Sequence, residues 1–78
     1  MKKLSYVPQR LLNKAAEIIC LFLNSIRKGW KPLIGLKNVW YSFELNKNYR
    51  LLTDGNTFFI GCHDAYENKI KNLKRFGH

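Results

Sequence analysis

Acidic residues are scarce in this sequence, which has five Asp and Glu against fourteen Lys and Arg and a formal net charge of +9. A surface with such an excess of cations attracts polyanions and raises the rate at which it meets them. The charge therefore favours a nucleic acid, or a complex that contains one, as the partner. An acidic protein partner alone would also account for the charge, and the two interpretations are compatible.

Cysteines and long apolar segments are equally few. The two cysteines, Cys20 and Cys62, lie far apart and outside any C-x-x-C spacing, so we expect reduced thiols, no disulfide framework and no metal site. The longest apolar run, residues 18–23, is much too short to span a bilayer. Pro8 interrupts the basic start of the chain, and no signal-peptide core follows. The sequence therefore predicts a cytoplasmic protein that makes no membrane contact.

The sequence also lacks the motifs of several enzyme classes. It contains neither the G-x-x-x-x-G-K-[ST] phosphate loop nor G-x-G-x-x-G, and no convincing serine or cysteine triad. It has no repeat, linker or low-complexity segment, and 78 residues leave room for only one core. We therefore expect a single domain over residues 1–78 that binds no cofactor.

Residues 9–28 carry apolar side chains at helical spacing, with polar residues on the opposite face. Pro8 suits the start of a helix, and Gly29 suits its end. Residues 2–7 alternate weakly and fit either a short edge strand or a frayed terminus. The pattern therefore predicts one long helix near the N-terminus, with this apolar stripe: Leu11, Leu12, Ala15, Ala16, Ile18, Ile19, Phe22, Leu23 and Ile26.

The second half of the chain has the pattern of an antiparallel meander. Residues 39–45, 49–53 and 57–62 predict three strands, joined by turns at residues 46–48 and at Asp54-Gly55. Residues 30–38 contain Pro32 and Gly35 and predict a loop. Asp64 and Glu67 then have the spacing of a capping box that would start a short C-terminal helix. The expected fold is α+β, with the long helix packed on a small antiparallel sheet.

One core is available to these elements, and each has one apolar side. We therefore expect part of the helix stripe to pack on the apolar face of the sheet. The expected partners are Leu12, Ile19, Phe22 and Ile26 of the helix with Tyr41, Phe43, Phe58 and Ile60 of the strands.

Three side chains near the end of the meander are candidates for phosphate chemistry. Arg50 lies within a predicted strand, where its planar fork would suit a phosphate, although it could equally be solvated or paired with Glu44. His63 lies where a strand meets a helix and could transfer protons, or could simply be a capping or surface residue. Tyr66 lies in the first turn of that helix, where its ring could belong to the core.

These residues could cleave RNA without a metal. One group would take the proton of the ribose 2′-OH, Arg50 would stabilise charge on the phosphate, and a second group would protonate the leaving 5′-oxygen. His63 and Glu44 are the proton-transfer candidates. Glu44 decides between two interpretations, because a carboxylate beside Arg50 supports acid–base chemistry whereas one paired with Arg50 would merely neutralise it. The predicted nucleic-acid contacts are Lys47, Lys69, Lys71, Lys74 and Arg75.

Three stretches of the sequence resemble the RelE/ParE superfamily of type II toxin–antitoxin toxins, especially its ParE-like branch. They are PLIGLKNVWYSFEL over residues 32–45, NYRLL over residues 48–52 and GCHDAYENKI over residues 61–70. Members of that branch carry a YRLL-like strand and a terminal H-[DE]-x-Y-N-K-like segment, into which Glu67 is inserted here. The resemblance extends over residues 11–73.

The resemblance implies a sheet with helices on one side, an acidic or amphipathic antitoxin partner, and one of two targets. RelE-like members cleave mRNA on the ribosome, and ParE-like members poison DNA gyrase. Arg50 takes the position of the strand arginine of the RNase members, and His63 with Tyr66 takes their C-terminal acid–base region. The preceding strand departs from the pattern, because Ser42 and Glu44 stand where RNase members carry further Lys or Arg. One helix also fills the place of a helical hairpin.

Together, residues and resemblance predict a toxin that inhibits translation by metal-independent mRNA cleavage. The alternative is a non-catalytic binding module, either a gyrase-directed inhibitor or a basic protein-interaction domain that has lost activity.

Overall fold

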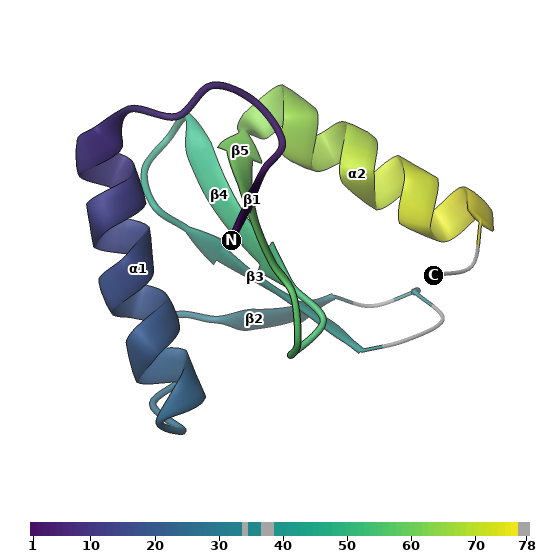
Figure 1. Ribbon diagram of the computed structural model, residues 1–78. Coiled ribbons are helices and arrows are strands. Elements are labelled where there is room, and N and C mark those ends of the chain that lie inside the picture. Colours follow the sequence, from purple (N-terminus) through teal and green to yellow (C-terminus); the bar gives the residue numbers. More distant parts are fainter. Residues whose placement is uncertain (34, 37–38, 77–78) are drawn as a thin grey trace.

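The computed structural model describes residues 1–33, 35–36 and 39–76 of the chain. These residues form a five-stranded sheet in the order β1-β5-β4-β3-β2 and two helices. The elements are β1 (Lys2–Lys3), α1 (Gln9–Leu23), β2 (Lys31–Leu33), β3 (Trp40–Glu44), β4 (Tyr49–Thr53), β5 (Phe58–Cys62) and α2 (His63–Phe76). The predicted α+β class is confirmed, and Figure 1 shows the arrangement. Among the described residues, no helix is long and apolar enough to cross a bilayer.

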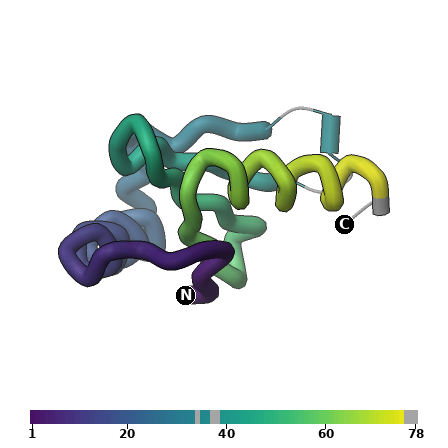
Figure 2. Tube along the Cα trace, turned by 90° about the horizontal axis from the view of Figure 1, so that it is seen from above, coloured from purple at the N-terminus to yellow at the C-terminus, as the bar shows by residue number. Residues whose placement is uncertain are grey.

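The two helices cover opposite faces of the sheet. Successive residues of a strand point to opposite faces, and in β4 both Leu51 and Leu52 are fully buried. Leu51 packs in one apolar cluster with Phe22 of α1, whereas Leu52 packs in a second cluster with Tyr66 of α2. Figure 2 shows the helices well apart, with the C-terminal end of α2 lying farthest from α1. Helices on one side of the sheet, as the resemblance implied, are therefore not observed.

The sheet is mixed instead of purely antiparallel. β1 pairs with β5 in parallel, with Lys2 opposite Phe59, so the N-terminal segment is an edge strand. β2 pairs antiparallel with β3 inside the stretch for which a loop was predicted. Pro32 is tolerated there because β2 is the edge of the sheet, where no further ladder bond is required. Two edge strands thus extend the predicted three-stranded meander.

The helix α1 ends at Leu23, five residues before its predicted end. Ser25 adopts a left-handed conformation with φ of 68°, and its N–H donates to the carbonyl of Phe22. The N–H of Ile26 donates to the carbonyl of Leu21 over 2.8 Å, which completes a Schellman motif. The predicted packing of Ile26 is therefore wrong, because this side chain lies beyond the helix and is 53% exposed.

Gly29 does not end the helix, as was predicted, and it has a packing role instead. Its φ is +86°, and a Cβ atom at this position would lie 2.7 Å from the ring of Phe43. The chain therefore turns tightly against the face of the sheet that α1 covers. Trp30 follows and is buried there, with its ring centroid 4.8 Å from that of Phe22.

The rest of the predicted core is confirmed. Phe22 is only 2% exposed, and its ring centroid lies 5.5 Å from that of Phe58 and 5.9 Å from that of Tyr41. Ile60 is fully buried in the same cluster. The remaining predicted members are partly buried against it: Leu12, Ile19 and Phe43.

The start of α2 differs from the predicted capping box. The helix begins at His63, so Asp64 lies inside its first turn and Cys62 takes the capping position. The backbone N–H of Ala65 donates to the Cys62 thiol, and this contact, followed by the Ser5 hydroxyl, lowers the pKa of Cys62. The helix has 14 residues against 15 in α1, so the C-terminal helix is not short.

Candidate functional site

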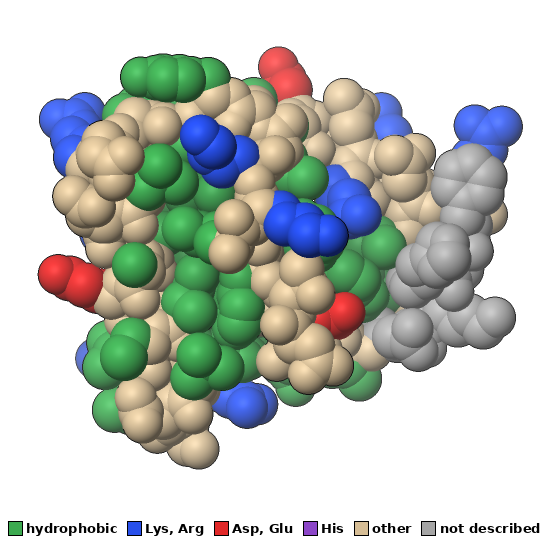
Figure 3. Space-filling model, in the orientation of Figure 1, with side chains coloured by type: hydrophobic (Ala, Val, Ile, Leu, Met, Phe, Trp, Pro, Cys, Tyr) green, Lys and Arg blue, Asp and Glu red, His purple; other side chains and the backbone are tan. Residues whose placement is uncertain are grey.

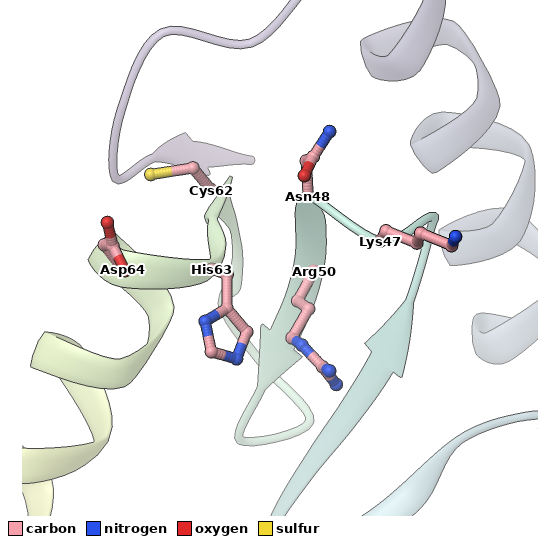
Figure 4. A pocket seen from close by; sticks show the side chains of 6 residues that line it. All are labelled: Lys47, Asn48, Arg50, Cys62, His63 and Asp64. Atoms are coloured by element: carbon pink, nitrogen blue, oxygen red, sulfur yellow. The ribbon is translucent and has the colours of Figure 1, made fainter.

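Six residues from three segments line a cavity of about 430 Å³ at one end of β4. Figure 4 shows these side chains, with those of Arg50 and His63 extending to the same side, while Cys62 points away from them. The structure therefore brings together two residues that lie thirteen positions apart in the sequence. The lining residues are Lys47 and Asn48 from the β3–β4 turn, Arg50 from β4, and Cys62, His63 and Asp64 from the junction of β5 and α2.

Hydrogen bonds to the backbone fix this arrangement. The side-chain oxygen of Asn46 accepts hydrogen bonds from the N–H groups of Asn48 and Tyr49, which closes the β3–β4 turn. The N–H of His63 donates to the carbonyl of Asn48 over 2.8 Å. Because Arg50 also lies opposite Gly61 in the β4–β5 ladder, the turn, the strand and the helix start are held in one register.

Arg50 is paired with Glu44, its partner in the β3–β4 ladder. Its Nη2 atom donates to Oε1 of Glu44 over 3.2 Å, and its guanidinium carbon lies 5.5 Å from the ring centroid of Tyr66. The Nε atom is buried and has no hydrogen-bond partner. A buried donor left unpaired costs roughly 1–3 kcal/mol, so Arg50 keeps an unused donor that an anionic ligand could satisfy.

The Arg50–Glu44 ion pair is accessible to solvent. The side chains are 28% and 58% exposed, respectively. Pairs of this kind contribute about 0–1 kcal/mol, because solvent screens them and two long side chains must be ordered. Of the interpretations left open by the sequence, the structure shows the paired arginine, although the pairing is weak enough for a phosphate to replace the carboxylate.

His63 has an acidic neighbour that the sequence interpretation missed. Its Nε2 atom lies 3.2 Å from Oε1 of Glu67, one helical turn further on, and both side chains are about half exposed. The signal was present, since residues four apart on a helix are neighbours, but Glu67 had been assigned to the capping box. A carboxylate at this place can orient the imidazole.

Tyr66 belongs to the second core cluster, together with Trp40, Leu52 and Leu73. It is buried and is not among the residues that line the cavity. Its ring makes a cation–π contact with the guanidinium of Arg50. A catalytic role for its hydroxyl stays a prediction.

Of the five predicted nucleic-acid contacts, only Lys47 lines the cavity. The ammonium of Lys69 lies 4.7 Å from the ring centroid of Phe59, and Lys71, Lys74 and Arg75 are exposed along α2. Figure 3 shows Lys and Arg side chains spread over the surface instead of gathered in one block. The predicted contacts therefore do not converge on the cavity.

A second cavity, of about 300 Å³, lies on the other side of Arg50. Arg50 lines both cavities, whereas His63 lines only the first and Glu44 only the second. The guanidinium is therefore flanked by an imidazole and a carboxylate that face different cavities. The second cavity is lined by Gly29, Lys31, Ser42, Phe43, Glu44 and Arg50.

Comparison with known proteins adds no relative to this geometry. No protein-family model matches the chain, and neither a curated protein nor a solved structure does. Within the part of the chain that the structure describes, no three His, Cys, Asp or Glu residues gather in a group that could hold a metal ion.

Proposed function

We propose that this protein cleaves RNA without a metal ion and acts in that way as a growth-inhibiting toxin. The observation that carries the proposal is the position of Arg50 between Glu44 and His63, each in a separate cavity. Displacement at phosphorus needs a base on the side of the attacking oxygen and an acid on the side of the leaving oxygen. Two proton-transfer groups flanking one arginine meet that requirement.

In the proposed reaction, Glu44 takes the proton of the ribose 2′-OH. The 2′-oxygen attacks the adjacent phosphorus, the bond to the 5′-oxygen breaks, and a 2′,3′-cyclic phosphate forms. Arg50 donates hydrogen bonds to the phosphate oxygens as negative charge grows on them, with its free Nε among the donors. His63 gives its proton to the leaving 5′-oxygen, and Glu67 orients the imidazole for the transfer.

A cleavage assay tests this proposal. Purified protein is incubated with a single-stranded RNA in the presence of EDTA, and the ends of the products are identified. We expect cleavage that EDTA does not inhibit and that leaves 2′,3′-cyclic phosphate ends. Lys14→Ala removes one positive charge from the exposed surface of α1 and is the matched control for Arg50→Ala. It should cleave like the wild type. Cleavage abolished by EDTA, or no cleavage at all, would contradict the proposal.

The toxin setting is supported by the resemblance described above and by the net charge of +9. An acidic or amphipathic antitoxin would bind such a surface, and the affinity should fall steeply as salt screens the charges. Expression in bacteria, with growth and mRNA integrity followed together, tests this setting. Arrested growth with fragmented mRNA is the expected result.

A non-catalytic binding module is the second candidate, and one observation favours it. Two of the three proposed catalytic side chains are already paired with carboxylates, Arg50 with Glu44 and His63 with Glu67. If these pairs persist in the complex, the site neutralises itself and the basic surface serves only to bind gyrase or another partner. Arrested growth with intact mRNA would favour this candidate.

A further inference from the structure

The second cavity is lined from both faces of the sheet, because Gly29 and Phe43 lie on the α1 side and its other lining residues lie on the side of the Arg50 guanidinium. Lys31 is opposite Ser42 in the β2–β3 ladder, and Glu44 is opposite Arg50 in the β3–β4 ladder. Residues opposite each other in a ladder share a face, and so do alternate residues of one strand. Helix α2 packs mainly on β4 and β5 and reaches β3 at Trp40, whereas Lys31, Ser42 and Glu44 lie toward the other end of β2 and β3.

Ser42 gives this cavity the character of a binding site. The residue is only 7% exposed, it lines the cavity, and no hydrogen bond or other interaction among the described residues involves its hydroxyl. Among the described residues, the buried polar side-chain atoms without a partner are the Trp40 Nε1 and the Arg50 Nε, so the Ser42 hydroxyl is open to the cavity and is available to a polar ligand there. Lys31 stands beside it with an exposed ammonium. Lysine and serine side chains both donate hydrogen bonds to phosphate and sugar oxygens in nucleic-acid complexes.

We propose that this second cavity binds the nucleotide on the 5′ side of the phosphate held by Arg50, and that the substrate is therefore single-stranded RNA with a defined polarity. This inference rests on the proposed function. The nucleotide whose 2′-OH attacks must reach Glu44, and Glu44 lines this cavity. Its base must leave the stack to enter, which a paired strand would resist.

Three residues then divide the recognition of that nucleotide. Lys31 contacts its 5′-phosphate, the Ser42 hydroxyl contacts its sugar, and Arg50 holds the phosphate that is cleaved. The Cα atoms of Lys31 and Arg50 are roughly 12 Å apart, from two strand spacings and two residues along the strand. With both side chains extended, this separation suits two phosphates of one strand.

Amide chemical-shift mapping by NMR tests the inference, with the deoxydinucleotide pdTpdT as the probe because it lacks the 2′-OH and cannot be cleaved. We expect shifts at the first cavity, at the amides of Asn48, His63 and Asp64. We also expect shifts at the second cavity, at the amides of Lys31, Ser42 and Glu44. Shifts confined to the first cavity would overturn the inference.

Affinities of variants for the same probe complete the test. Lys31→Gln should weaken binding by about tenfold and Ser42→Ala by a few fold, because each removes one contact to the 5′ nucleotide. Lys14→Gln on α1 is the matched charge control and should bind like the wild type. If both second-cavity variants bind as tightly as the wild type, the inference fails. If Arg50→Gln also binds as tightly as the wild type, the proposed function fails with it.

Discussion

Nη2 of Arg50 lies 3.2 Å from Oε1 of Glu44, its partner in the β3–β4 ladder. Arg50 lines both cavities and Glu44 lines the second. The proposed activity therefore depends on a competition between this carboxylate and a phosphate for the guanidinium. A phosphate that reaches Arg50 must displace a carboxylate, and the displaced carboxylate is then free to act as a base.

Replacing Glu44 with Gln should separate binding from catalysis. The variant should bind the uncleavable pdTpdT more tightly, by about two- to fivefold, because the amide competes less well for Arg50 than a carboxylate does. Cleavage of RNA should fall by about 10²–10⁴-fold, because the base is lost. Affinity and rate measured on the same preparation check both effects. Tighter binding with faster cleavage would show that Glu44 only neutralises Arg50.

Replacing His63 with Ala should lower the cleavage rate by about 10²–10⁴-fold through the loss of the acid. The variant should keep its fold, since His63 is exposed and its backbone N–H, which bonds Asn48, is retained. Glu67→Gln should cause a smaller loss of rate, because it removes only the partner of the imidazolium. Initial rates, with circular dichroism as the folding control, test this ordering. A Glu67→Gln variant slower than His63→Ala would contradict the assigned roles.

Replacing Phe22 with Ala should lower the free energy of unfolding by about 3–5 kcal/mol, because the ring is buried among three aromatic neighbours and leaves a cavity. Ile26→Ala is the matched control. It should change the free energy by less than about 0.5 kcal/mol, because this side chain lies beyond the end of α1 and is exposed. Urea denaturation measures both values, and equal losses would contradict the described end of the helix.

Acidification should weaken the β4–β5 turn through Asp54. The N–H of Thr57 donates to its carboxylate over 2.8 Å and that of Asn56 over 2.9 Å, and these bonds lower the pKa of Asp54 below its ordinary value of 3.8. Because the folded-state pKa is depressed, the contribution to stability is complete above pH 3.8 and is lost as the pH falls through the lower folded value. Urea denaturation at a series of pH values checks the effect. The advantage of the wild type over Asp54→Asn should shrink in that range, and an advantage independent of pH would contradict it.

Regular patterns predicted the centre of the fold well. The strand Tyr49–Thr53 was predicted with its observed bounds, because the Asp54-Gly55 turn marks its end. The edges of the sheet could not be predicted in the same way. β1 and β2 have two and three residues, too few for an alternating pattern, and their pairing depends on distant strands. Nor could the end of α1 be predicted, because Ser25 is a residue type that rarely adopts positive φ.

The same division holds for the site. The chemistry of Arg50 and His63 singled them out, since few other side chains serve phosphate and proton transfer. The sequence left open whether Glu44 would pair with Arg50, because that contact depends on strand register. Lys31 and Ser42 were missed for the same reason, since the strand that carries Lys31 was itself missed. Residues joined by tertiary pairing carry no spacing signal in the chain.

Cleavage of a single-stranded RNA in EDTA by the wild type and by Arg50→Ala tests the central claim most directly. The account predicts metal-independent cleavage by the wild type and a loss of about 10²–10³-fold in the variant, because charge on the phosphate is no longer stabilised. The variant should fold normally, since Arg50 is partly exposed and lies outside both core clusters. Equal cleavage rates for the wild type and Arg50→Ala would contradict the account.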